Sequence, residues 1–206
     1  MKPRFWNALI LVFGLLAGAA AQAQVNISGA LAAGDATLPG PNRLYRDGVA
    51  STCGAAKGFP GTTPSVGQRY DEYTVTNTGA AQCVTFTISA TTCSAAGAHL
   101  TAYSGAFVPG NVATGYLGDS GSTSFASTPR TMSIDMVAGQ TIRLVVSNGD
   151  RVGDCDYTVT ATAAGVVVPG ASGGVAAVPT LGEWSLMLLG LLAAGLGVRN
   201  VRQRQA

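Results

Sequence analysis

From Tyr70 onward, apolar and polar residues alternate along the chain. The alternation covers residues 73–76, 84–89, 131–136, 142–147 and 157–160, and the apolar positions are rich in β-branched side chains. A period of two with such residues is typical of half-buried strands. Turn signals separate the stretches at residues 77–79, 137–140 and 147–150. The pattern predicts an all-β protein, an antiparallel β-sandwich or jelly roll over residues 70–163.

The segments on either side of this region lack a clear period. Residues 24–69 are rich in glycine, proline and alanine, so we expect a loop-rich N-terminal segment of the body with one or two short edge strands. Residues 164–178 have the Gly/Ala/Pro composition of a flexible linker. No helical period of useful length occurs before Thr180.

The N-terminus has the layout of an export signal. Lys2 and Arg4 precede an apolar run of fourteen residues, 8–21. Ala21 and Ala23 then place small residues at the −3 and −1 positions of a cleavage site. These features predict a signal peptide, residues 1–23, cut by signal peptidase after Ala23. The alternative is an uncleaved anchor, but the run is shorter than the ~20 residues that a spanning helix needs.

The C-terminus predicts a short capped helix. Thr180 and Glu183 have the spacing of a capping box, and Pro179 and Trp184 occupy the staple positions around it. The apolar stretch 184–198 would extend roughly 22 Å as a helix, less than the ~30 Å of a hydrocarbon core. The alternative is a packed core helix, which would carry a polar face, yet residues 186–198 contain no polar side chain.

Basic residues follow the apolar stretch in the tail 199–206. By the positive-inside rule, this tail stays in the cytoplasm, which places the body on the other side of the inner membrane, in the periplasm. The predicted signal peptide selects the same side. The basic residues are Arg199, Arg202 and Arg204.

The whole C-terminal segment, residues 179–206, resembles a known protein-sorting signal. The motif residues are Val178, Pro179, Thr180, Leu181, Glu183 and Trp184. With the apolar helix and the arginines, they resemble the IPTL-CTERM signal of Gram-negative bacteria, a relative of PEP-CTERM. That family usually opens with Ile and has Gly after the Trp, where this chain has Val178 and Ser185. The resemblance implies a helix held only transiently in the inner membrane, cut near the Pro-Thr by an exosortase-type transpeptidase, with the body then secreted or moved to the cell surface.

The body has a second, broader resemblance. It rests on Tyr70–Tyr73, Cys83–Thr85, Ala102-Tyr103, Gly115–Asp119, Ala138–Thr141, Leu144–Val146 and Cys155–Val159. These segments are similar to bacterial pre-peptidase C-terminal domains, which implies a jelly roll over residues 70–163.

Four cysteines lie in the exported part, at Cys53, Cys83, Cys93 and Cys155. An even number in an oxidising compartment predicts two disulfides, for which three pairings can be drawn. We favour Cys83–Cys93, as a clip across a hairpin, together with Cys53–Cys155. Zinc is disfavoured because there is no Cys-x-x-Cys and a single histidine.

Composition narrows the function classes. The chain is 47% hydrophobic and 11% charged, which argues against disorder. Residues 1–23 and 179–206 each carry a net charge of +2, whereas residues 24–178 have seven basic and nine acidic side chains, a net −2. Basic charge is confined to the ends, so the body lacks the footprint of a nucleic-acid-binding protein.

The segment Gly118-Asp119-Ser120-Gly121 matches the nucleophile segment of chymotrypsin-like proteases, with His99 as the only available base. His99 lies only 21 residues before Ser120, and the body is too small for two barrels. We therefore interpret the segment as a loop in which Asp119 and Ser120 bond turn amides. We expect His99 at the surface of a strand edge.

Two further groups could bind ligands. Asp150, Asp154 and Asp156 lie on a glycine-rich turn that could hold Ca²⁺, although their spacing differs from an EF-hand and a solvated hairpin is the simpler interpretation. Four aromatic residues could form a sugar-stacking platform, although core packing is the commoner role. These are Tyr45, Tyr103, Phe107 and Tyr116.

The sequence thus predicts an exported surface or extracellular-matrix β-sandwich protein without catalytic activity or cofactor. The alternative is a module that binds extracellular polysaccharide or another protein, with or without Ca²⁺.

Overall fold

The computed structural model describes residues 24–40, 42–93, 96–163 and 165–168. This part of the chain consists of strands and loops and contains no helix. The strands are β1 (Gln24–Leu31), β2 (Arg43–Leu44), β3 (Thr62–Thr63), β4 (Tyr70–Asn77), β5 (Gln82–Ala90), β6 (Ala98–Ser104), β7 (Tyr116–Asp119), β8 (Arg130–Met136), β9 (Thr141–Asn148), β10 (Cys155–Thr162) and β11 (Val166–Val167).

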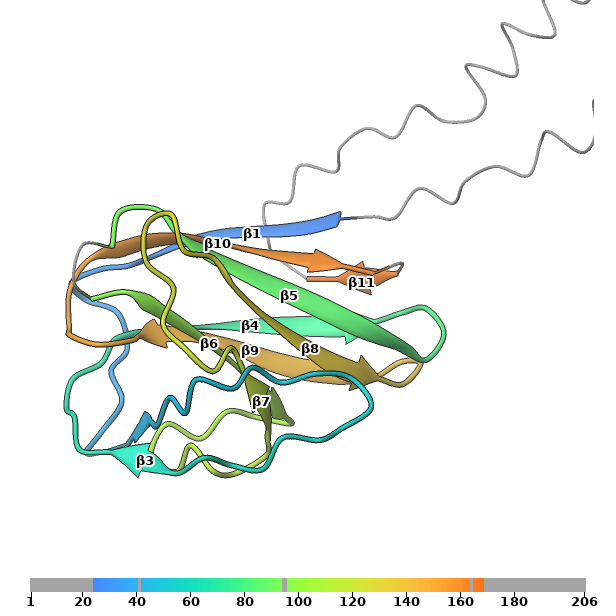
Figure 1. Ribbon diagram of the computed structural model, residues 1–206, viewed down its shortest axis with the longest axis horizontal. Helices are drawn as coiled ribbons and strands as arrows, with labels where there is room; N and C mark the ends of the chain where they lie inside the picture. The colour runs from blue at the N-terminus through green and yellow to red at the C-terminus, as the bar shows by residue number, and fades with distance from the viewer. Residues whose placement is uncertain (1–23, 41, 94–95, 164, 169–206) are drawn as a thin grey trace, which may run out of the picture. The chain divides into compact units, whose positions relative to one another are not determined.

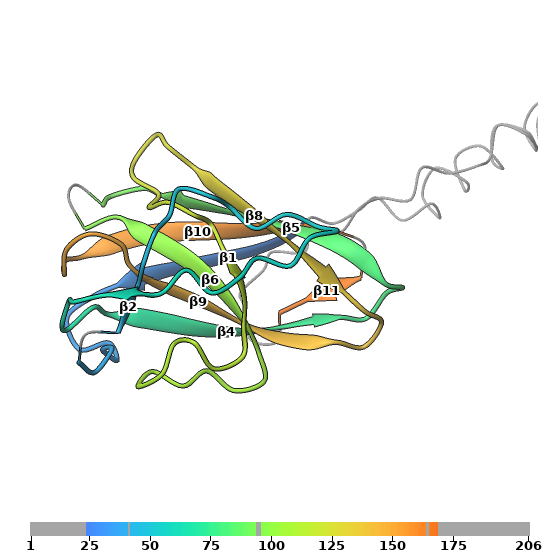
Figure 2. The ribbon, with the colours of Figure 1, turned by 60° about the horizontal axis from the view of Figure 1, so that its bottom comes forward.

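The strands form two antiparallel sheets that face each other, as Figures 1 and 2 show. One sheet has the order β1-β10-β5-β8, and the other has the order β11-β4-β9-β6-β7. A small third sheet pairs β2 with β3. The main core is built by alternate residues of both large sheets, such as Phe86 and Ile88 of β5 and Leu144 of β9. All five stretches of predicted alternation lie in strands, which confirms an all-β body with antiparallel sheets.

A second, smaller cluster lies on the other face of the five-stranded sheet. Tyr103 of β6 and Val145 of β9 pack there against Leu44 and Phe107. Because loops cover this face, β6 is buried on both sides and its burial does not alternate. The sequence of β6 does alternate, with Ala98, Leu100 and Ala102 in the main core, but two of these three residues are alanines and give a weak signal.

The two large sheets include strands outside residues 70–163. β1 pairs with the whole length of β10, and Ile27 and Leu31 are buried in the main core. At the other end, Val166 of β11 pairs with Asn77 of β4 and is also buried, inside the predicted linker 164–178. β1 is an edge strand in residues 24–69, where one or two short edge strands were expected, and β11 adds a short strand after residue 163.

The disulfides join Cys53 to Cys83 and Cys93 to Cys155, so the favoured pairing was wrong. Cys83 and Cys93 lie at opposite ends of β5. A strand of that length holds them roughly 30 Å apart, at ~3.3 Å per residue, so no hairpin brings them together. Cys93 instead lies beside the start of β10, and Cys53 beside the start of β5.

Candidate functional site

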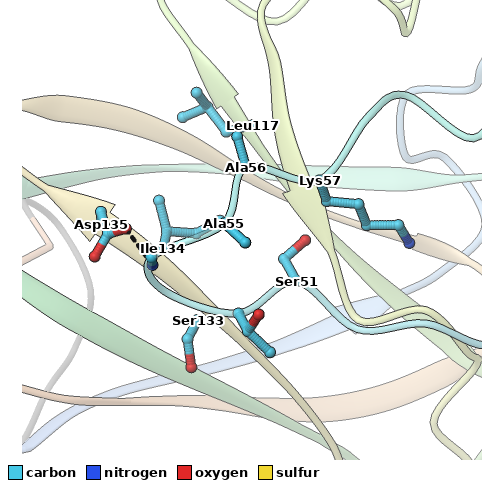
Figure 3. A pocket seen from close by; sticks show the side chains of 10 residues that line it. Ser51, Ala55, Ala56, Lys57, Leu117, Ser133, Ile134 and Asp135 are labelled. Atoms are coloured by element: carbon cyan, nitrogen blue, oxygen red, sulfur yellow. Dashed lines mark hydrogen bonds between the residues drawn. The ribbon is translucent and has the colours of Figure 1, made fainter.

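A long loop, residues 45–61 between β2 and β3, closes one side of the body. The amide of Ser51 donates to the carbonyl of Asp119 in β7 at 2.9 Å, and the amide of Ser133 in β8 donates to the carbonyl of Ser51 at 2.8 Å. The segment around Ser51 thus runs between the edge strands of the two sheets, as Figure 3 shows for Ser51, Leu117 and Ser133.

Two glycines of the Gly118–Gly121 segment allow the loop to lie this close. A Cβ on Gly118 would stand 2.2 Å from the Ser51 Oγ. A Cβ on Gly121, whose φ is +69°, would stand 2.4 Å from the carbonyl carbon of Val49. The glycines that suggested a nucleophile segment are therefore explained by the close approach of the loop.

Lys57 carries the loop's main polar contact with the sheet. Its Nζ lies 2.8 Å from Asp119 Oδ2 and 2.8 Å from Asp47 Oδ1, and it also donates to the carbonyl of Val49. The side chain of Lys57 is 9% exposed and that of Asp119 is fully buried. Such a buried ion pair is costly to break, because either charge alone would be left without solvent.

Asp119 has three further neighbours. The Tyr116 hydroxyl donates to Oδ2 and the Gly121 amide donates to Oδ1. His99 Nε2 lies 3.4 Å from Oδ1. Burial would raise the pKa of Asp119, but hydrogen bonds and charge from His99, Lys57 and Tyr116 outweigh it and lower that pKa to about 2. Asp119 is therefore a carboxylate at neutral pH.

His99 is not at a strand edge, as we had expected, but is buried on β6 between β9 and β7. Its Nδ1 lies 3.4 Å from Thr101 Oγ1. Burial lowers the pKa of His99, with Arg46 and Lys57 adding to this, and the nearby Asp119 opposes it. The covering loops make the residue internal, which no local pattern indicated.

The structure brings His99 to Asp119 but gives Ser120 other partners. Ser120 Oγ accepts from the Leu100 amide at 3.3 Å and donates to the Ser122 carbonyl at 3.1 Å. In the described residues, no hydrogen bond joins Ser120 to His99. The arrangement does not activate Ser120 as a nucleophile.

A pocket of about 250 Å³ lies between the loop, β7 and β8. Asp135 lies on one side of the pocket and accepts from the Gly54 amide at 2.7 Å. The Lys57 side chain is directed away from Asp135, as Figure 3 shows. The sulfur atoms of Cys53 and Cys83 lie within 4.8 Å of an Asp135 oxygen. The sulfurs are bonded to each other, so this donor set lacks the thiolates that a soft metal needs.

The three aspartates of the proposed Ca²⁺ turn have separate partners. Asp150 pairs with Arg46 at 2.8 Å and Asp154 with Arg69 at 2.5 Å. Asp156 Oδ2 accepts from Thr92 Oγ1 at 3.0 Å. Within the described structure these carboxylates form no cluster.

The four aromatic residues do not form an exposed platform. Tyr103 and Phe107 are buried and pack together with ring centroids 4.8 Å apart. Tyr116 is half-buried and contacts Phe59, and Tyr45 is 48% exposed. The group mainly fills the second core, so stacking on a sugar would have to rely on Tyr45 or Phe59.

Sequence reasoning missed Lys57 and Asp47. Both lie in the loop-rich segment outside any motif. One signal was available, because Lys57 is the only lysine between residues 3 and 206.

The IPTL-CTERM motif matches residues 176–205, whereas no curated protein matches the chain. The match covers all six predicted motif residues and the three arginines, although these lie outside the described residues, as do Ala21 and Ala23. The predicted C-terminal helix lies there too, and the described residues include no helix of sufficient length and apolar character to cross a bilayer. The similarity of the body to pre-peptidase C-terminal domains stays a prediction.

Proposed function

We propose that this chain is a surface or extracellular-matrix protein whose C-terminal segment directs its sorting and is then removed. The IPTL-CTERM motif at residues 176–205 carries this proposal, because a motif of this kind marks an exported protein that a dedicated protease or transpeptidase processes. The enzyme would be of the exosortase type, and signal peptidase would remove residues 1–23. The body would serve as a non-catalytic jelly-roll module.

The two disulfides and the Lys57–Asp119 ion pair, which holds the 45–61 loop to β7, support a body that stays folded outside the cell. Two disulfides fix the ends of β5 to distant segments. Such cross-links persist in oxidising compartments and reduce the freedom of the unfolded chain. Binding of a polysaccharide or protein is the second candidate, favoured by the exposed rings of Tyr45 and Phe59 in the 45–61 loop.

The sorting step is tested with a double variant, Pro179→Ala with Thr180→Ala. Pro169→Ala in the preceding linker is the matched control, because it lies outside the motif match. The native chain and the control should yield a product that lacks the C-terminal segment, whereas the double variant should end at Ala206 and remain with the membrane fraction. The proposal is wrong if the native product ends at Ala206 or if the double variant is processed normally, as intact mass will show.

A further inference from the structure

Lys57 and Asp119 form a buried ion pair rather than a surface one. Both side chains are at least nine-tenths buried, and they come from segments 62 residues apart. Nζ lies 2.8 Å from Oδ2, and two further donors hold the carboxylate in place. We propose that Nζ of Lys57 and Cγ of Asp119 become joined by an intramolecular isopeptide bond.

The surroundings of the carboxylate fit the attack of an amine on Cγ. Nζ is held 2.8 Å from an oxygen of the carboxyl group that it would attack, and a reactant fixed so close to its target reacts as if it were highly concentrated. The Gly121 amide donates to Oδ1, and His99 Nε2 lies on the same side. These groups would stabilise the negative charge that Oδ1 gains as Cγ becomes tetrahedral. Oδ1 is therefore the oxygen that stays as the amide carbonyl.

Asp47 supplies the proton transfer. Asp47 Oδ1 lies 2.8 Å from Nζ of Lys57. It is therefore placed to accept the proton that the ammonium group must lose before its nitrogen can attack. Asp47 accepts one proton, the nitrogen lone pair forms the N–C bond, and a second nitrogen proton moves to Asp119 Oδ2. Asp47 then returns its proton to Oδ2, the C–O bond breaks, and Oδ2 leaves as water. One hydrogen remains on the amide nitrogen and no redox partner is needed.

The buried position favours the product. An ammonium and a carboxylate both lose hydration in this site, whereas a neutral amide has little charge to desolvate. Because Asp119 begins as a carboxylate, the reaction is slow and should follow folding. The bond would tie the 45–61 loop to β7, whereas the Cys53–Cys83 disulfide ties it to β5, and the bond would survive reduction.

The protein recovered from cells tests the proposal by intact mass after reduction and denaturation, compared with the sequence between its observed termini. The native product should be lighter than its sequence by one water, and Asp119→Asn should be lighter by one ammonia. Lys57→Arg should have the mass calculated from its sequence, because the guanidinium keeps the positive charge but does not form the isopeptide bond with Asp119. A succinimide at Asp47-Gly48 would also release water, but that loss would persist in Lys57→Arg.

Peptide mapping gives the second readout. A protease specific for free lysine should fail to cut the native chain after Lys57, and a branched peptide joining residues 57 and 119 should be found. A native product of full mass that is cleaved after Lys57, even after prolonged incubation of the folded protein, would overturn the proposal and leave an ordinary ion pair.

Discussion

At the scale of single residues, the body depends on a few buried polar side chains with distinct roles. Asn77 is fully buried, and its side-chain Nδ2 donates to the carbonyls of Ala80, Met136 and Val137, which joins the β4–β5 turn to the end of β8. His99, by contrast, has only long contacts to Asp119 and Thr101. Of the two, only His99 can take up a proton, and burial lowers the pKa at which it does so in the folded protein.

We expect His99 to make the body less stable on acidification. Burial lowers its pKa below the ordinary 6.5, so the unfolded chain binds a proton that the folded chain does not. Stability should therefore be constant above about pH 7 and fall as pH drops below 6.5, by at most about 1.4 kcal/mol per pH unit. Loss of the Asp119 charge in an amide would lower this pKa further and keep the same sign.

Urea unfolding at pH 7.5, 6.5 and 5.5 measures this dependence. His99→Gln keeps a polar side chain but does not titrate, so its stability should vary little over this range. His99 is the single histidine of the chain, so no other imidazole confuses the comparison. Equal slopes for the native chain and the variant would contradict the assignment.

At the scale of elements, alternation revealed the strands that have one buried face, and other features depended on tertiary contacts. Val84, Phe86 and Ile88 point into the main core while their neighbours are partly exposed, so β5 could be predicted. β6 also alternates, but two of its three residues in the main core are alanines, so its signal is weak. The burial of its second face depends on loops from distant segments. The disulfide pairing and the Lys57–Asp119 contact likewise depend on which distant segments meet.

The two disulfides should differ in how much they stabilise the body. Cys93–Cys155 is buried and closes the longer separation, 62 residues against 30 for the partly exposed Cys53–Cys83. Chain entropy favours the longer loop slightly, and two buried hydroxyls would add a desolvation cost. We expect Cys93→Ser/Cys155→Ser to lose about 3–5 kcal/mol and Cys53→Ser/Cys83→Ser about 2–3 kcal/mol.

Thermal or urea unfolding of the two double-serine variants compares them directly, because each removes one disulfide and adds the same two side chains. The Cys53/Cys83 variant should also expose the 45–61 loop to limited proteolysis, while the Cys93/Cys155 variant should not do so selectively. A greater loss of stability in the Cys53/Cys83 variant would show that the loop anchor, not the buried bond, dominates.

At the scale of the whole molecule, the folded body and the matched motif occupy separate stretches of the chain. The sheets account for the described residues up to Val168, and the motif begins at residue 176. The Lys57–Asp119 ion pair, the pocket and the disulfides contain no residue of the matched segment. A sorting signal that is read by its own enzyme should therefore act independently of the body it follows.

We accordingly expect residues 169–206 to direct processing when they are fused to an unrelated exported β protein. If the proposed sorting holds, the fusion should lose its C-terminal segment in the native host, because it carries the whole matched motif. The same fusion with Pro179→Ala and Thr180→Ala should keep its full C-terminus, as intact mass and a C-terminal epitope will show. If the native fusion stays uncut while the natural chain is processed, recognition must extend into the body, and the division between the two parts is wrong.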